Sequence, residues 1–166
     1  MAEELKKEEI EQKPRPKVDF MRYEIKTKEE AEKFINVIWP TLVNGLDEII
    51  ESSKGDLSRG IVLKEVLNGY SNLWLGFVDG KYAGFATTTF NPHLDGLNFI
   101  TIKQVYIKKG TALEILLKGQ KKLFEFGKKL NCDKVRMVTN NLKERKALRR
   151  LGWKPTYQEY EINLKE

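Results

Sequence analysis

The residues best suited to chemistry lie in the stretch IKKGTAL, where a strand-like segment meets a helix-like one. A glycine turn that enters a helix presents backbone N–H groups beside the positive end of the helix dipole, and both attract phosphate. The donors would be Lys109, Gly110, Thr111 and Ala112, with Lys108 and Lys109 adding positive charge. The segment predicts a pyrophosphate seat, although it lacks the glycine spacing of a Walker loop or a dinucleotide fingerprint.

The strand before this turn, LNFITIKQVYI, predicts a distortion in the sheet. Lys103 and Gln104 are adjacent in an otherwise apolar run, so strict alternation would place one of them in the core. A β-bulge would resolve the conflict and splay the strand from its neighbour; the alternatives are an edge position or a Lys103 side chain that reaches solvent. A splayed strand would expose the backbone groups of Val105, Tyr106 and Ile107 to an extended amide ligand.

The elements that must position these residues follow from hydrophobic periodicity and turn signals. Thr27 and Glu30 form a capping box at the start of the first helix, and Pro40 ends that helix or opens the next. The apolar face of the first helix is expected to consist of Ala31, Phe34, Ile35 and Ile38, which have helical spacing. Asp79-Gly80 predicts a tight hairpin turn. The expected strands are 19–27, 72–78, 81–90, 97–107, 133–139 and 155–164, and the expected helices are 28–39, 41–55, 56–69, 108–131 and 141–151. The helices 41–55 and 56–69 are alternatively one interrupted element. The buried side of 108–131 is expected to include Leu113, Leu116, Leu117, Leu123, Phe124 and Phe126. This order predicts an α+β fold, with a mixed, mostly antiparallel sheet, one parallel βαβ unit and flanking helices.

The last predicted helix adds a second marker, NLKERKALRRLGW. Asn141 is a good N-cap residue, with Glu144 at the capping-box position. Gly152 suits the left-handed residue that ends a helix, and Trp153 would anchor the following turn in the core. The N-terminus of this helix would face the same groove as the glycine turn.

With these two segments in this element order, residues 20–164 resemble the GNAT fold, the Gcn5-related N-acetyltransferases. The family binds the pyrophosphate of acetyl-CoA with a Gln/Arg-x-x-Gly-x-Gly/Ala signature. Gly110 and Ala112 match its end, whereas Ile107 stands where Gln or Arg is usual. The resemblance implies a central splayed βαβ unit, acetyl-CoA as co-substrate and an amine as acceptor. It also implies that Asn141 and residues 105–112 contact the cofactor.

The resemblance leaves the catalytic group open. The family's tyrosine, which often protonates the leaving thiolate, falls on Leu148, which carries no proton. Acetyl transfer needs a group that removes the ammonium proton and donors for the oxyanion. The candidates are Tyr106, Tyr157 and the single histidine, His93. Each also has a simpler interpretation, as a packed aromatic or a solvated loop residue. No metal site is expected, because Cys132 is the sole cysteine.

Charge and composition keep a second function open. The chain has 166 residues and a net charge of +6, and residues 101–155 hold 16 Lys and Arg against 4 Asp and Glu. This excess fits a solvated surface, a nucleotide site, or contact with nucleic acid or an acidic protein. A catalytically inactive GNAT-like interaction module, for example in a larger or phage assembly, is therefore the alternative to an acetyltransferase.

The ends and the location of the chain complete the expectations. Residues 1–17 are polar and predict a disordered, charged tail, followed by one domain over 18–166. The absence of a signal-like or membrane-spanning apolar run predicts a cytoplasmic protein without a membrane partner. The acceptor amine and the oligomeric state cannot be read from the sequence.

Overall fold

The computed structural model describes residues 16–53, 57–92, 96–137, 139 and 142–155. A five-stranded sheet runs through this part of the chain in the order β1–β2–β3–β4–β5. β4 and β5 are parallel, and the other neighbours are antiparallel. The strands are β1 (Val18–Tyr23), β2 (Asn72–Val78), β3 (Lys81–Pro92), β4 (Asn98–Ile107) and β5 (Lys134–Met137). The helices are α1 (Lys28–Lys33), the π-helix η1 (Phe34–Ile38), α2 (Trp39–Ser52), α3 (Arg59–Leu67), α4 (Ala112–Lys129) and α5 (Leu142–Arg150).

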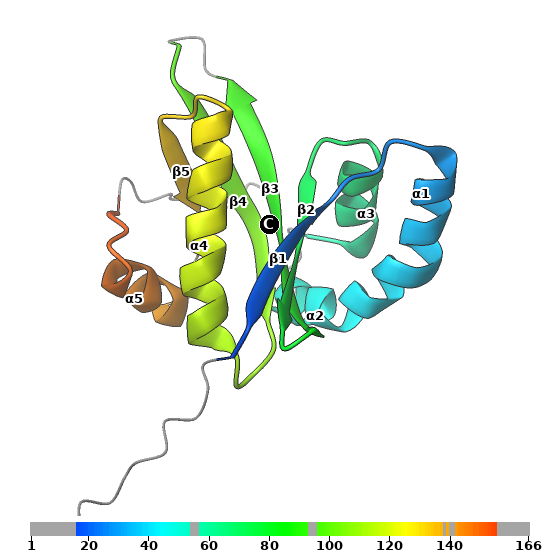
Figure 1. Cartoon of the computed structure of the whole chain (residues 1–166), viewed down its shortest axis with the longest axis horizontal. Coiled ribbons are helices and arrows are strands. Elements are labelled where there is room, and N and C mark those ends of the chain that lie inside the picture. Colours follow the sequence, from blue (N-terminus) through cyan, green and yellow to red (C-terminus); the bar gives the residue numbers. More distant parts are fainter. Residues whose placement is uncertain (1–15, 54–56, 93–95, 138, 140–141, 156–166) are drawn as a thin grey trace, which may run out of the picture.

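Helices cover both faces of the sheet. Figure 1 shows α4 and α5 on one side and α1, α2 and α3 on the other. The larger apolar cluster joins the sheet to α1–α3 and includes Phe34, Leu46 and Leu73, each 1% exposed or less. On the α4 side, Trp74, Ile102 and Leu123 form a second cluster. The predicted α+β fold with one βαβ crossover, β4–α4–β5, is confirmed.

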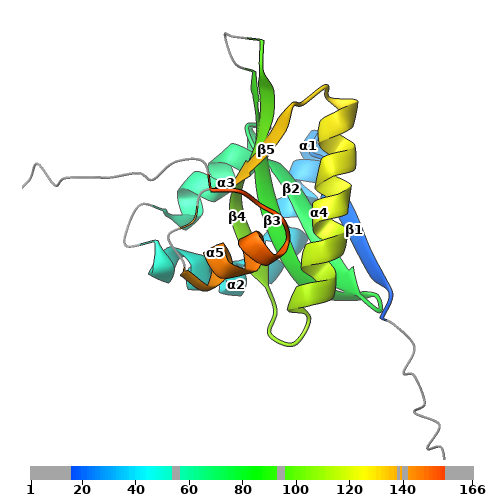
Figure 2. The same ribbon diagram turned by 90° about the vertical axis from the view of Figure 1, so that its left-hand side faces the viewer.

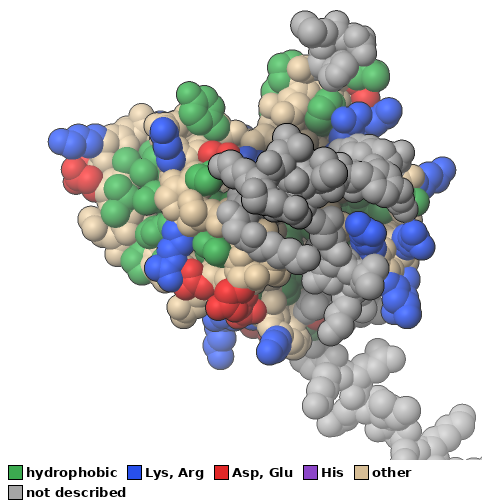
Figure 3. Space-filling model, turned by 180° about the vertical axis from the view of Figure 1, so that it is seen from behind, with side chains coloured by type: hydrophobic (Ala, Val, Ile, Leu, Met, Phe, Trp, Pro, Cys, Tyr) green, Lys and Arg blue, Asp and Glu red, His purple; other side chains and the backbone are tan. Residues whose placement is uncertain are grey.

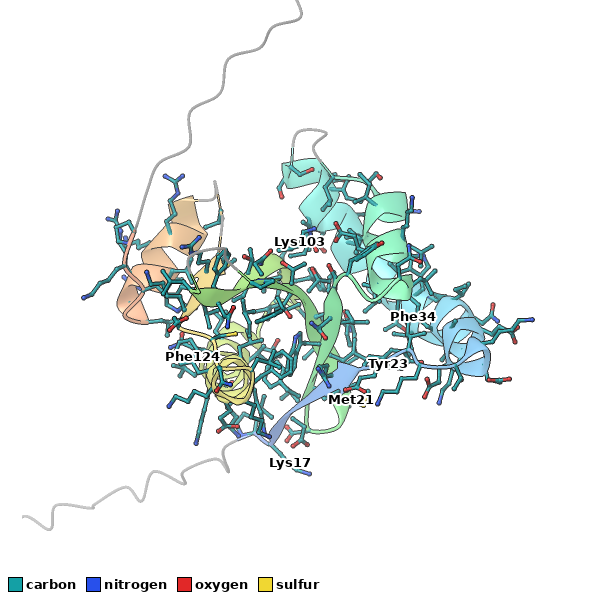
Figure 4. All side chains as sticks on the ribbon, turned by 90° about the horizontal axis from the view of Figure 1, so that it is seen from above. Lys17, Met21, Tyr23, Phe34, Lys103 and Phe124 are labelled. Carbon is teal, nitrogen blue, oxygen red and sulfur yellow. The ribbon has the colours of Figure 1, made fainter. Side chains whose placement is uncertain are left out.

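The expectation that Pro40 opens the second helix is confirmed, but the first helix continues into the second. Helix α1 begins at the predicted capping box, but the chain then passes through the π-helix directly into α2, without a break. Pro40 is tolerated because it stands in the first turn of α2. The π-helical turn also disrupts the predicted apolar face. Phe34 is fully buried beside Tyr23 (Figure 4), whereas Ile35 is 43% exposed.

Other boundaries shift by a few residues. β1 ends at Tyr23 rather than at Thr27, and Thr27 instead caps helix α1. β3 continues through Pro92, into the segment expected to be a loop. Helices α2 and α3 are separate, so the possibility that they form one interrupted element is wrong. The hairpin turn at Asp79-Gly80 is confirmed, with Asp79 at φ 49° and Gly80 at φ 75°. Most of the predicted tail and the strand over 155–164 lie outside the described residues.

The buried face of α4 is only partly as predicted. Leu123 is buried and Leu116 and Phe126 are half-buried, but Leu117 and Phe124 are 49% and 40% exposed. Ile115, which was not in the predicted set, is 4% exposed and packs against β1 and β3. Gly119 lies close to Phe20 of β1, since a Cβ atom there would be 3.0 Å from the ring. None of the described helices is long and apolar enough to cross a bilayer.

Candidate functional site

The bulge predicted in β4 is present at Lys103. Thr87 pairs with Gln104 and Thr88 with Ile102, so Lys103 is the extra residue on β4. Gln104 is buried and accepts a hydrogen bond from the Thr87 hydroxyl, which satisfies its amide oxygen. Lys103 turns toward the helices instead and forms an ion pair with Glu65 of α3 (Figure 4).

Beyond the bulge, β4 leaves its parallel partner. The register between β4 and β5 ends at Ile102 and Met137. β4 then continues to Ile107, and in the described part of the chain it pairs there with β3 alone. The edge of β4 that faces away from β3 is therefore open to a ligand that can hydrogen-bond with its backbone.

The glycine turn follows at the end of β4. Gly110 has φ 90°, a left-handed conformation that glycine adopts readily, and a Cβ atom there would meet nothing within 4 Å. The Thr111 hydroxyl donates to the Lys108 carbonyl at 2.8 Å and makes no cap bond to α4. Open space and an uncapped N-terminus of an 18-residue helix fit a bound phosphate group. Lys109 is exposed, whereas the ammonium of Lys108 lies 5.2 Å from the centre of the Tyr82 ring.

The side chains along the open part of β4 point to opposite faces. Val105 and Ile107 pack in the clusters on the α4 side, and Tyr106 packs on the α2 side. The Tyr106 ring lies against Gly45 of α2, where a Cβ atom would leave no room for it. The centre of the ring is 6.0 Å from that of the Phe85 ring.

Tyr106 ends beside a carboxylate. Its hydroxyl donates to Oε1 of Glu48 on α2 over 3.4 Å. Burial, and secondarily the negative charge of Glu48, raise the pKa of Tyr106 above its ordinary value of 10.0. The phenol therefore stays protonated near neutral pH, so it can donate a proton or a hydrogen bond but cannot serve as a base.

Helix α5 is fastened to α4 by Trp153. The backbone N–H of Trp153 donates to the Leu148 carbonyl and that of Gly152 to the Arg149 carbonyl, with Gly152 at φ 86°. This is the helix-ending motif expected at Gly152. The Trp153 indole N–H then donates to Oε1 of Gln120 at 2.9 Å. Figure 2 shows α5 beside α4, over the open part of β4.

A cavity of about 410 Å³ lies along the open edge of β4, between α2, α4 and α5. Tyr106 and Leu148 both line it, so a phenol is present in the cavity although the position matched to the family's tyrosine carries leucine. The cavity also reaches residues that the sequence did not indicate. These include Glu48, Ile49, Ser52, Phe85, Ile115 and Met137.

The structure brings together only some of the predicted site residues. Val105, Tyr106 and Ile107 line the cavity, and 108–111 form the turn beside it. Ala112 is the first residue of α4. His93, Asn141 and Tyr157 lie outside the described residues. Glu48 was missed, although Gly45, Glu48, Ile49 and Ser52 have the spacing of one helical face.

Comparison with known proteins gives a result from structure only. No family model matches the sequence, and no curated protein does. A ribosomal-protein-alanine N-acetyltransferase from Brucella melitensis biovar Abortus superimposes with a TM-score of 0.63 at 15% identity, covering 89% of this chain and 100% of its own. An aminoglycoside acetyltransferase from a soil metagenome gives a TM-score of 0.62 at 14% identity, over 89% and 99% of the two chains. An aminoglycoside N-acetyltransferase solved in complex with CoA gives 0.59 at 14% identity, over 92% and 97%.

At these identities the likeness establishes the fold and leaves activity open. It agrees with the mixed five-stranded sheet and its flanking helices. This chain therefore has the fold of the Gcn5-related N-acetyltransferases.

Proposed function

We propose that this protein transfers an acetyl group from acetyl-CoA to an amine. The observation that carries the proposal is the cavity along the open edge of β4, which ends near the glycine turn and the uncapped N-terminus of α4. Its shape and chemistry fit a long, partly amide ligand with a pyrophosphate. The three structurally similar acetyltransferases above support the same reaction class.

Each part of the cavity has a role in the proposal. The backbone of Val105–Ile107 binds the amide groups of the pantetheine arm, and the N–H groups of 109–112 bind the pyrophosphate. Asn141, which directly precedes α5 in the sequence, is expected to contact the same ligand. Leu148 supplies only apolar contact, and a thiol with a pKa of about 8.5 is a tolerable leaving group without help. Among the described residues that line the cavity, Tyr106 carries the one phenol, and this group could donate a proton.

The first test is the melting temperature with acetyl-CoA. A ligand at about 100 times its Kd adds about 2.7 kcal/mol to the free energy of unfolding. For a chain of this length, each kcal/mol raises the melting temperature by about 2–4 °C. No shift at millimolar acetyl-CoA would reject the proposal.

The second test places a charge in the seat. Gly110→Asp should abolish the shift, because a carboxylate would face the pyrophosphate. Gly69→Asp is the matched control, since Gly69 also has a positive φ and open space around its Cα but lies between α3 and β2. Unchanged binding in Gly110→Asp would place the site elsewhere. Release of free CoA thiol in the presence of amines would then measure transfer.

A non-catalytic interaction module is the second candidate. Leu148 in place of the family's tyrosine favours it, as does the exposed basic surface of α5, made by Arg145, Lys146, Arg149 and Arg150. Figure 3 shows Lys and Arg side chains over the side of the molecule formed by α4 and α5. This candidate predicts binding to DNA, RNA or an acidic protein that weakens steeply with salt. Absence of nucleic-acid binding at low salt would remove the nucleic-acid version.

A further inference from the structure

The cavity continues beyond the proposed seat of the pantetheine arm. With the pyrophosphate at Gly110 and the arm along residues 105–107, the sulfur end of the ligand points back toward the bulge in β4. Ile102, on the far side of that bulge, forms the last pair between β4 and β5 with Met137, and both residues line the cavity. The cavity therefore extends past the sulfur, in the direction that the acyl group of a thioester would take.

This extension runs over the face of the sheet that α4 covers (Figure 1). We call it the inner arm and define it by the residues that both line the cavity and pack in the apolar cluster on that face: Trp74, Ala86, Ile102, Leu123, Met137 and Trp153. Trp74, Ile102 and Leu123 are each at most 8% exposed, so these walls of the inner arm lie in the core of the protein.

A small side chain leaves room in the inner arm. Ala86 of β3 pairs with Trp74 of β2 on one side and with Val105 of β4 on the other. Directly opposed residues of antiparallel strands point to the same face of a sheet. The three side chains thus form a row across the sheet, in which a single methyl group lies between two larger side chains. The low middle of this row is space that a ligand can fill.

The polar atoms of the inner arm are already bonded. The Trp74 indole N–H donates to Oγ1 of Thr88 at 3.0 Å, and the Trp153 indole N–H donates to Oε1 of Gln120 at 2.9 Å. The other four side chains that define the arm are apolar. Water in such a space lacks the roughly two to four polar partners that it needs, whereas an apolar chain is stabilised by leaving bulk water.

An acetyl group is too small to fill this arm. From Trp74 to Val105 the row spans two inter-strand spacings, about 10 Å in all. A methyl group packs at about 3.5–4.0 Å from its neighbours and so covers less than half of that length. Acetyl-CoA would therefore leave most of the inner arm empty.

We propose that the inner arm binds a straight acyl chain of medium length, so that the preferred donor is an acyl-CoA longer than acetyl-CoA. The inference rests on the proposed transfer to an amine and names the donor for it. In that reaction the nitrogen of the neutral amine forms a bond to the acyl carbonyl carbon, and the C–S bond breaks with its electron pair on sulfur. The surplus nitrogen proton ends on the thiolate, which leaves an amide and free CoA thiol.

The experiment measures the Kd of acetyl-, butyryl-, hexanoyl- and octanoyl-CoA for the full chain by isothermal titration calorimetry. Burial of each added methylene group tightens binding by about fourfold at most. Because ordering of the chain offsets part of this gain, hexanoyl-CoA should bind about tenfold to a hundredfold more tightly than acetyl-CoA.

Two variants change the size of the inner arm. Ala86→Ile places a branched side chain, which suits a strand, in the middle of the row, and should remove most of the preference for hexanoyl-CoA while acetyl-CoA still binds. Met137→Ala enlarges the arm and should raise the affinity for octanoyl-CoA more than that for hexanoyl-CoA, so the inference can be tested even if Ala86→Ile does not fold.

Lys81→Ile is the matched control for Ala86→Ile. It puts the same side chain on the same strand, at an exposed position that does not line the cavity. Its Kd values for the four thioesters should stay within about twofold of those of the parent protein.

Equal Kd values for acetyl-CoA and hexanoyl-CoA would overturn the inference and leave the acetyl-CoA seat standing. A preference for hexanoyl-CoA that survives in folded Ala86→Ile would also overturn it, as would a Met137→Ala variant with unchanged relative affinities. Failure to bind any of the four thioesters would instead reject the proposed function, and this inference with it.

Discussion

The contact between Gly45 and Tyr106 predicts an alanine substitution with an unusual sign. Gly→Ala in the interior of a helix normally stabilises a protein by about 1 kcal/mol. At Gly45, however, the new Cβ atom would lie 2.3, 2.5 and 2.6 Å from three atoms of the Tyr106 ring. Carbon atoms normally approach to about 3.5–4.0 Å, so the ring would have to move by about 1 Å or more.

Two opposing effects set the expected change in the free energy of unfolding of Gly45→Ala. Overpacking of a well-packed site costs about 1–3 kcal/mol, which outweighs the helix gain of about 1 kcal/mol. Gly60 in α3 provides the matched control, because a Cβ atom there would meet nothing within 4 Å. Gly60→Ala should raise stability by about 0.4–1 kcal/mol. The two variants should differ by about 2 kcal/mol, or about 4–8 °C in melting temperature.

Thermal unfolding of four proteins decides the matter: the parent chain, Gly45→Ala, Tyr106→Leu and the double variant. If the ring is what opposes the new methyl group, Gly45→Ala should destabilise the parent chain but stabilise the Tyr106→Leu background. A Gly45→Ala variant that melts as high as Gly60→Ala would refute the reasoning. So would a Gly45→Ala effect that is the same in both backgrounds.

Three further outcomes can be measured on the same protein. Tyr82 has a buried hydroxyl without a hydrogen-bond partner among the described residues, and burial raises its pKa, so Tyr82→Phe should be neutral or slightly stabilising at pH 7. As the pH passes 10, the Tyr82 hydroxyl ionises in the unfolded chain but stays protonated in the folded one, because burial raises its pKa. The free energy of unfolding should therefore fall above pH 10, and should fall less in Tyr82→Phe. Melting temperatures between pH 8 and 11 check this. Glu65→Gln removes the ion pair with Lys103, which is only partly exposed, and should lower the free energy of unfolding by about 1 kcal/mol in denaturant. It should also weaken acetyl-CoA binding, because Lys103 forms the bulge in β4. Unchanged acetyl-CoA binding would show that the binding site does not depend on the bulge. Trp153→Phe keeps an aromatic ring but loses the hydrogen bond to Gln120 and part of the indole packing, and should lower stability by about 1 kcal/mol or more. An unchanged melting temperature would show that the hydrogen bond does not help to hold α5.

The order of the elements could be predicted from the sequence because each carries a local signal. The hairpin turn, the capping box at Thr27 and the glycine end of α5 all fix backbone geometry through one or two residues. The bulge was also predictable, since two adjacent polar residues in an apolar strand cannot both alternate correctly. The structure confirms these features.

What could not be predicted depends on contacts between distant segments. Glu48 and Tyr106 are far apart in the chain, and only the packing of α2 on β4 brings them together. The exposure of Leu117 and Phe124 has a similar origin, because the neighbours of α4 decide which part of its apolar surface is covered. The π-helical turn carries no recognised sequence signal, so the predicted apolar face of the first helix was wrong at Ile35.

That π-helical turn has a consequence for how this site could change. The N–H of Trp39 donates to the carbonyl of Phe34, five residues back, so the turn contains one residue more than an α-helical turn. One residue corresponds to about 100° of rotation in an α-helix. Deleting one residue within 34–38 would therefore reorient α2 about its axis relative to α1, carrying Glu48 away from Tyr106 while both helices keep their own sequences. A single insertion or deletion remote from the cavity could thus exchange the residues that line the α2 end of the cavity, a route to new specificity that needs no substitution at the site itself.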